Sequence, residues 1–263
     1  MSVKSCFTLP VWDFQTDQEQ TNAVVLRYLT LEKFVSLLKF NAMWFSRLGA
    51  LQDEFEGTDP QGPRAKLLQI PNRAQLLNRL EQGRSVDPAR IGCVVSCWFL
   101  GENESLEMWS EYGENGKGVA IRSTIKRLST SFYIAGDFAM ISAVGRVKYV
   151  NFESHDMGND AVSVLRVAFL KDKKRFDWEQ EARIVTTNGL HNGCLNPDGS
   201  SVSGYKFDPH CKGFHIKCNL QELVQKVIVG SNADVERFNL IKELVGKHNL
   251  ILEKSKLNSF SSQ

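Results

Sequence analysis

An unbroken apolar segment near the middle of the chain constrains the fold most. Residues 91–99, IGCVVSCWF, carry no charge and a single hydroxyl, that of Ser96. A strand that is exposed on one face alternates polar and apolar residues, whereas a strand covered on both faces is apolar throughout. The segment therefore predicts a central strand buried on both faces of a sheet. The 263 residues are enough to bury such a core, and we expect one domain over 1–263.

The rest of the chain predicts the other elements of an α+β fold. Strands are expected at 23–30, 41–48, 117–123, 143–150, 181–187, 213–218 and 226–230, and helices at 31–40, 105–112, 161–172 and 234–247. Thr30 is placed to cap the first of these helices. Residues 60–88 predict a helical insert, 189–204 a polar loop or hairpin, and 254–263 a disordered tail. Because strands and helices do not alternate strictly, we expect a mixed or antiparallel central sheet.

Composition and missing motifs narrow the classes of function. The hydrophobic fraction of 42% and the charged fraction of 24% are those of a soluble globular protein. The net charge of +2 argues neither for nor against a polyanionic partner. No apolar run spans a membrane and the first residues lack a signal-peptide core, so we expect a cytoplasmic protein without a membrane partner. The chain has no P-loop, dinucleotide GxGxxG, HExxH or GxSxG motif, which disfavours many common enzyme classes.

The cysteines and histidines give little support for a metal site. The chain has six cysteines, and in a long chain without an export signal an even count does not imply disulfides. His210, Cys211, His215 and Cys218 lie near one another in the sequence, but their spacing matches no familiar zinc pattern. We expect strand and turn residues here and no bound metal.

The stretch WEQEARIV places two carboxylates where a strand begins. In a strand, residues two apart face the same side, so Glu179, Glu181 and Arg183 would share a face. Two carboxylates that close raise each other's pKa unless a cation separates them, and Arg183 is the candidate cation. The alternative is that these Glu and Arg side chains form a ladder on the solvent-exposed surface. Trp178 and the apolar residues that follow Arg183 instead favour a position of this group beside the core.

Three further positions are candidates for chemistry, each with a plain structural alternative. Arg27 ends an early strand and is either functional or solvated. Ser96 is either functional or a buried hydroxyl with a hydrogen-bond partner. Asp53, Glu54 and Glu56 form either a solvated acidic turn or a carboxylate patch that binds metal.

Several blocks together resemble a bacterial family known as domain of unknown function 2971. The matching residues over about 23–230 are Tyr28; Asp53 and Glu56; Met108, Trp109 and Tyr112; and Trp178, Glu181 and Arg183. Gln52, Asp53 and Glu54 stand where the family has asparagine, aspartate and proline, so this turn is open to a different shape. The family name implies no activity.

More distantly, the order of arginine, serine and glutamate on successive strands resembles the arginine–serine–glutamate class of ADP-ribosyltransferases. The resemblance implies that Arg27 contacts the phosphates of NAD, that Ser96 positions the ribose and holds the catalytic glutamate, and that Glu181 stabilises the oxocarbenium ion. Glu179 would be the general base toward the acceptor, and Trp109 or Tyr112 would stack on nicotinamide. It also places Tyr28, Thr30, Ser46 and Arg183 around the cofactor.

The sequence therefore predicts an NAD-dependent ADP-ribosyltransferase or NAD glycohydrolase that acts as an effector, toxin or phage-defence protein. Its partners would be NAD, a protein or nucleic-acid acceptor, and a partner protein of a defence system. One alternative is a non-catalytic nucleotide- or protein-sensing module, suggested by Trp98, Phe99, Trp109 and Tyr112. Another is a metal-dependent nuclease that uses Asp53, Glu56, Glu179 and Glu181.

Overall fold

The computed structural model describes most of the chain, with gaps. The described residues are 11–12, 21–53, 55–58, 88–133, 142–155, 164–187, 194–201 and 211–257. The predicted helical insert at 60–88 lies outside them except for Pro88, and so does much of the predicted loop at 189–204.

One large sheet organises the described residues. Its strands are β1 (Val11–Trp12), β2 (Val24–Leu29), β3 (Ala42–Arg47), β4 (Cys93–Leu100), β5 (Val119–Thr124), β6 (Ala143–Arg146), β9 (Glu181–Thr187), β10 (Cys194–Leu195), β11 (Gly213–Lys217), β12 (Lys226–Val229) and β13 (Leu252–Lys254). They follow the order β1-β6-β9-β4-β2-β5-β12-β13, and β3 joins β4 to β11 and β10. Only β1–β6 and β12–β13 are parallel pairs among these described strands. The expected α+β fold with a mixed, mostly antiparallel sheet is therefore confirmed.

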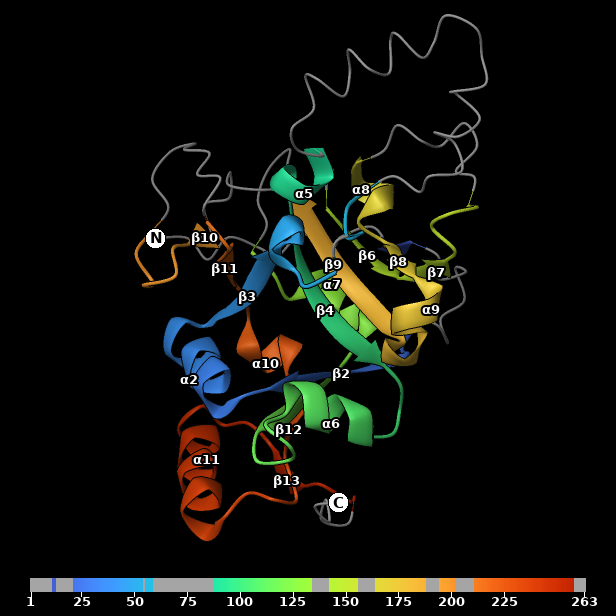
Figure 1. Cartoon of the computed structure of the whole chain (residues 1–263). Helices are drawn as coiled ribbons and strands as arrows, with labels where there is room; N and C mark the ends of the chain where they lie inside the picture. The colour runs from blue at the N-terminus through green and yellow to red at the C-terminus, as the bar shows by residue number, and fades with distance from the viewer. Residues whose placement is uncertain are drawn as a thin grey trace, which may run out of the picture.

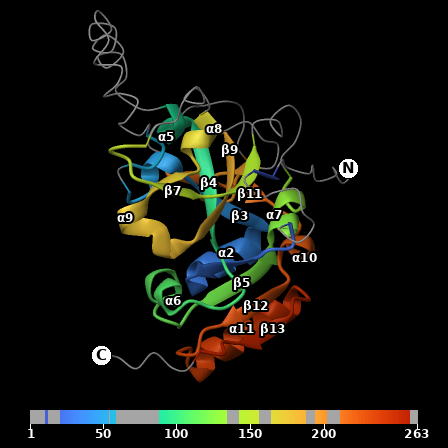
Figure 2. The same cartoon turned by 90° about the vertical axis from the view of Figure 1, so that its right-hand side faces the viewer.

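Short helices surround the sheet. They are α2 (Leu31–Phe40), α5 (Pro88–Gly92), α6 (Leu106–Tyr112), α7 (Ile125–Thr130), α8 (Val164–Val167), α9 (Lys173–Phe176), α10 (Leu220–Leu223) and α11 (Val235–Lys247), with single 3₁₀ turns η1 (Leu48–Ala50) and η4 (Asp177–Glu179). Figures 1 and 2 place α5 and α8 at one end of the molecule and α11 with β13 at the other. Within the described residues, no helix has the length and hydrophobicity needed to cross a bilayer.

The apolar segment forms the predicted central strand, β4, with a corrected start. Ile91 and Gly92 belong to α5, and the strand begins at Cys93. Val95 packs in an apolar cluster on one face of the sheet, whereas Val94 and Trp98 pack in the main core on the other. All three side chains are at most 1% exposed, which confirms burial on both faces.

One edge of β4 is shared by two strands that diverge. At one end β2 pairs Val25 with Leu100 and Leu26 with Phe99. At the other end β3 pairs with Val94 and Val95. Between these two ladders no described strand pairs with residues 96–98 on this edge, although β9 pairs with all of β4 from Cys93 to Phe99 on the other. The sheet therefore forks between β2 and β3, as Figure 1 shows.

Three sequence-based expectations are corrected at their boundaries. The strand expected at 143–150 is two strands, because β7 (Lys148–Val150) leaves the large sheet and pairs with β8 (Leu170–Asp172). The helix expected at 161–172 is described only from 164, where α8 has four residues, and the chain then turns into β8. Residues 167–170 are all buried, a pattern that no amphipathic surface helix has. Residues 254–257 are not part of a disordered tail, since Lys254 lies in β13 and the Lys256 amide donates to Glu104, and residues 258–263 lie outside the described residues.

Helix α2 has the cap that the sequence predicts, and this cap provides a test of the fold. The Thr30 hydroxyl accepts from the Lys33 amide at 3.2 Å, and Phe34, Leu37 and Leu38 face the core. Replacing Thr30 by alanine should lower the free energy of unfolding by about 1 kcal/mol. Ser36→Ala within the same helix should not lower it, because alanine has the higher helix propensity. Denaturant titration measures both, and equal losses would contradict this assignment of the cap.

Candidate functional site

A cavity of about 580 Å³ lies at the fork of the sheet. Its volume falls within the range of about 300–1,000 Å³ that is typical of small-molecule sites. Its lining includes residues from both faces of the sheet, namely Arg27, Leu29 and Trp98 on one face and Cys97, Phe99 and Glu181 on the other, together with Trp44, His215, Tyr112, Lys171 and Glu179. The lining therefore combines charged and aromatic side chains.

Arg27, on β2, bridges the fork. Its Nη1 donates to Ser96 Oγ and to the Cys97 carbonyl, each at 2.7 Å, and Nη2 donates to the Trp44 carbonyl at 3.4 Å. The Nε atom has no partner among the described residues. Burial lowers the pKa of this guanidinium below its ordinary value. No carboxylate among the described residues pairs with it directly to offset this effect. A half-buried cation without a paired anion favours an anionic ligand.

Ser96 does not have the position that the resemblance implies. Its hydroxyl accepts from Arg27 and from Trp98 Nε1 at 3.0 Å, and it is fully buried. In the β4–β9 ladder Ser96 lies opposite Ile184, whereas Glu181 lies opposite Phe99. Because neighbouring residues in a strand face opposite sides, Ser96 and Glu181 project from opposite faces of the sheet. Ser96 therefore orients Arg27 and does not hold the glutamate.

Arg183 holds Glu181 instead. Its Nε and Nη2 donate to the two Glu181 carboxylate oxygens at 2.9 and 2.8 Å. Nη1 and Nη2 also donate to Glu56 at 2.7 and 2.6 Å, and Nη1 reaches the Ala168 carbonyl at 2.7 Å. Arg183 is fully buried, as is nearly all of both carboxylates. Such charge-assisted pairs fix geometry, and removing one partner of a buried pair costs about 3–5 kcal/mol.

The positions of Asp53 and Glu56 overturn the solvated reading of the acidic turn. Glu56 is 1% exposed and Asp53 is 3% exposed, so the turn is not solvated. Arg183 and the Lys171 ammonium lie where a metal ion would bind between the carboxylates of Glu56 and Glu181. Within the described residues no group of three metal-ligating side chains is arranged to hold a metal ion, and His210 lies outside them.

Lys171 is the site residue that sequence analysis missed. It lies on β8, and its Nζ atom is 3.3 Å from Glu181 and 3.5 Å from Glu56, with a closer contact to Glu179. The same nitrogen lies 4.6 Å from the centre of the Phe176 ring, which is within cation–π range. The apolar run around 164–170 predicted a helix, so nothing in the local pattern placed this lysine beside the carboxylates.

Glu179 reaches the cluster by a route that differs from the expected one. It lies in the turn η4, and Gln180 has the left-handed φ of 39°, so the strand begins only at Glu181. The two glutamates therefore do not share a strand face, but Lys171 bridges them. The Tyr112 hydroxyl donates to Glu179 at 2.8 Å, which links α6 to the turn after α9; Figure 2 shows both helices on one side of the sheet.

The surrounding charges give the two glutamates different acidities. Burial alone would raise the pKa of Glu181, but the charges of Arg183 and Lys171 lower it to about 2. Burial raises the pKa of Glu179 above its ordinary value, and Lys171 only partly offsets this. Glu181 is therefore a permanent anion at neutral pH, and Glu179 is the stronger base of the two.

The remaining predicted site residues divide between the cavity and the core. Tyr28 lines the cavity, with its hydroxyl accepting from the Ser105 amide, and Ser46 lines it with its hydroxyl accepting from Trp44 Nε1. Thr30 caps α2 and is absent from the lining. Trp109 is fully buried, and its Nε1 donates to Glu104. Of the two expected stacking residues, Tyr112 alone reaches the cavity.

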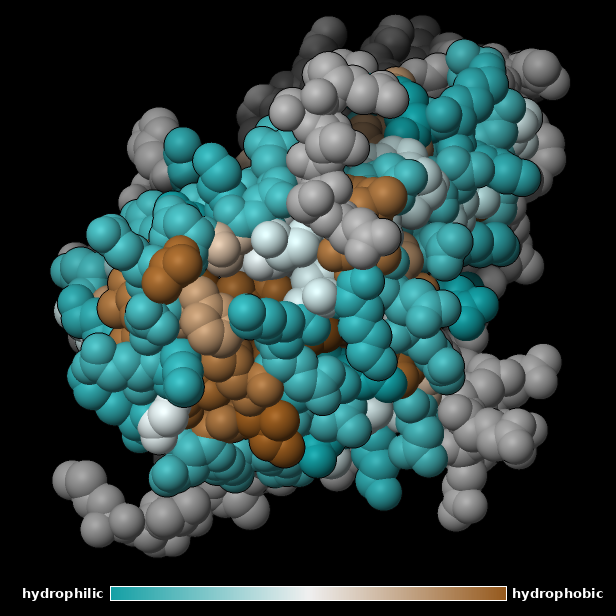
Figure 3. Space-filling model, turned by 90° about the horizontal axis from the view of Figure 1, so that it is seen from below, coloured by the Kyte–Doolittle hydropathy of each residue, from teal (hydrophilic) through white to brown (hydrophobic). Residues whose placement is uncertain are grey.

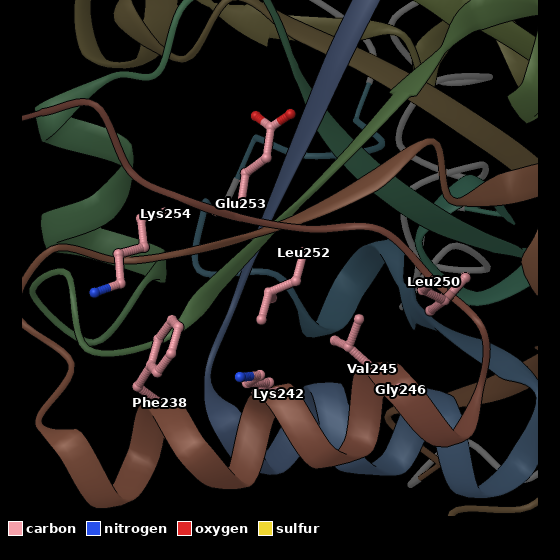
Figure 4. Close-up of a pocket in the computed structure, with 8 residues that line it drawn as sticks. All are labelled: Phe238, Lys242, Val245, Gly246, Leu250, Leu252, Glu253 and Lys254. Atoms are coloured by element: carbon pink, nitrogen blue, oxygen red, sulfur yellow. The ribbon is translucent and has the colours of Figure 1, made fainter.

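A second hollow lies far from these charges, between α11 and β13. Its lining includes Phe238, Val245 and Leu252, and Glu253 points away from the helix (Figure 4). The Glu253 carboxylate forms an ion pair with Lys226. Seen from this end, the surface carries a hydrophobic patch (Figure 3), and Ile251 is 62% exposed. Nothing in this hollow resembles the carboxylate cluster, so the cavity at the fork is the candidate site.

The lowered pKa of Glu181 predicts how stability depends on pH. The pKa is about 2 in the folded chain against 4.5 for an ordinary glutamate, so the carboxylate stabilises the fold above pH 4.5, and this contribution is lost as the pH falls toward 2. The free energy of unfolding should therefore fall less steeply over this window in Glu181→Gln than in the wild type. Denaturant titrations at several pH values test this, and parallel profiles would contradict it.

Two comparisons with known proteins found no match for this chain. No protein-family model matches the chain, and no curated protein matches it. The resemblances drawn from the sequence therefore remain predictions, and the function has to be inferred from the residues around the fork.

Proposed function

We propose that the chain cleaves the bond between nicotinamide and ribose in NAD and transfers the ADP-ribosyl group to water or to an acceptor. The observation that carries this proposal is that Arg27 and the ionised Glu181 line one cavity. The two residues come from β2 and β9, which flank β4 on either side, and Glu181 is close enough to act on the charge of Arg27. The ADP-ribosyltransferase resemblance requires such a meeting of distant residues.

The charges of the cavity match those of NAD. Three carboxylates contact two cations, Arg183 and Lys171, which leaves this cluster with a net negative charge. The nicotinamide ring is a cation in NAD, and it would bind beside these carboxylates. Arg27 would bind the negatively charged diphosphate, because a guanidinium offers paired donors to phosphate oxygens. The rings of Trp44 and His215, which contact each other in the cavity lining, are left for the adenine.

Glu181 is suited to the step that breaks the bond. As the bond from C1′ to the ring nitrogen breaks, its electron pair leaves with nicotinamide, and positive charge develops on the ribose. A fixed anion beside that carbon stabilises this charge more than it stabilises the ground state. Arg183 holds the carboxylate in place before the reaction, so little reorganisation is needed.

Glu179 is suited to activate the acceptor. Its raised pKa makes it a better base than an ordinary glutamate, and it accepts a hydrogen bond from Tyr112, a residue that lines the cavity and is partly exposed. Water or an acceptor hydroxyl or amine would attack C1′, and its proton would pass to Glu179. A role as an effector, toxin or defence protein, and the family suggested by the sequence, rest on the resemblances alone.

The release of nicotinamide tests this proposal. Glu181→Gln should lower the rate of NAD cleavage by about 100-fold or more, the loss typical of a group that stabilises transition-state charge. Glu236→Gln on the exposed face of α11 is the matched control and should keep the wild-type rate. Chromatography of NAD incubations, with melting curves to confirm folding, measures the effect. If the wild type releases no nicotinamide with or without candidate acceptors, the proposal is wrong.

A further inference from the structure

The environment of Lys171 is that of a bound organic cation. Its ammonium group contacts carboxylates from three separate elements: Glu56 in the turn after η1, Glu179 in η4 and Glu181 at the start of β9. It also lies 4.6 Å from the Phe176 ring centre. Carboxylates together with an aromatic face are the combination that recognises cations with a hydrophobic body.

Lys171 also controls access to Glu181 from the cavity. Of the two residues that donate to Glu181 in the hydrogen bonds described above, Lys171 lines the cavity, whereas Arg183 is fully buried behind the carboxylate. Arg183 is fixed by its bonds to Glu56 and to the Ala168 carbonyl. A lysine side chain has several rotatable bonds and no rigid fork, so Lys171 is the donor that can move.

We propose that Lys171 is an internal competitor that occupies the binding site of a pyridinium cation and leaves it when that ligand binds. The ring would take the place of the ammonium group between Phe176 and the carboxylates of Glu179 and Glu181. This inference deepens the proposed function by assigning the nicotinamide end of the cavity, and it makes Lys171 a positioning residue rather than a catalytic one. Binding then exchanges one cation for another and keeps the net charge of the cluster.

The proposal distinguishes ligands by charge. A neutral ring of the same shape displaces the ammonium group without replacing its charge, which leaves the buried carboxylates underneutralised. A cationic ring avoids this cost. The site should therefore prefer 1-methylnicotinamide, which is a cation, to nicotinamide, which is neutral.

The test removes the competitor without changing the charge of the cluster. The double variant Lys171→Met, Glu179→Gln removes one cation and one carboxylate together, so the remaining residues keep their net charge. It should bind 1-methylnicotinamide about tenfold more tightly than the wild type in calorimetry, with a smaller gain for nicotinamide. The exposed neighbour Lys174 gives the control, and Lys174→Met should bind as the wild type does. Equal or weaker binding of the cation by the folded double variant would overturn the proposal.

A measurement on the wild type covers the case in which the double variant does not fold. Lys171 is 7% exposed and should react slowly in reductive methylation of lysines. Adding 1-methylnicotinamide should speed its labelling, read by peptide mass spectrometry, while Lys174 is unaffected. Unchanged or slower labelling of Lys171 at saturating cation would overturn the proposal. Neither measurement uses NAD cleavage, so a chain that binds the cation but releases no nicotinamide refutes the proposed function alone.

Discussion

The fork in the sheet at β4 is the constraint on which the site depends. Strands β2 and β3 share one edge of β4 and leave its residues 96–98 between them without a strand partner in the described chain. A buried carbonyl needs a hydrogen bond, and Arg27 supplies one to Cys97. The guanidinium thus replaces a missing strand, and the same gap provides a cavity that reaches both sides of the sheet. Structure and ligand chemistry therefore depend on the same residue.

A second constraint comes from burying charge behind that cavity. Three carboxylates and two cations lie almost fully buried together, and Arg183 satisfies Glu56 and Glu181 at once with paired hydrogen bonds. Burial raises the pKa of each glutamate, and the neighbouring cations lower it. The cations dominate at Glu181, so its pKa is lowered, whereas burial dominates at Glu179, so its pKa is raised. One carboxylate is suited to stabilise a cation and the other to accept a proton, although both belong to one short segment.

The features that depend on local sequence patterns could be predicted from the sequence. The buried β4, the Thr30 cap, the start of β9 and the Glu181–Arg183 pair follow from apolar runs, capping chemistry and the two-residue repeat of a strand. The partners from distant segments did not follow. Glu56 lies 127 residues from Arg183, and Lys171 lies on strand β8 in a segment for which the sequence predicted a helix. The face occupied by Ser96 depends on register in the β4–β9 ladder, which a single sequence does not specify.

The central claim is that Arg27 and Glu181 contact one ligand across the fork. The most direct measurement is a crystal structure of the full chain with an NAD analogue whose ribose ring oxygen is replaced by a methylene group, so that it is not cleaved. We expect the diphosphate within hydrogen-bonding distance of Arg27 and C1′ facing the Glu181 carboxylate. An analogue bound elsewhere, or one that lies in the cavity with its diphosphate away from Arg27 and its C1′ away from Glu181, would contradict the account.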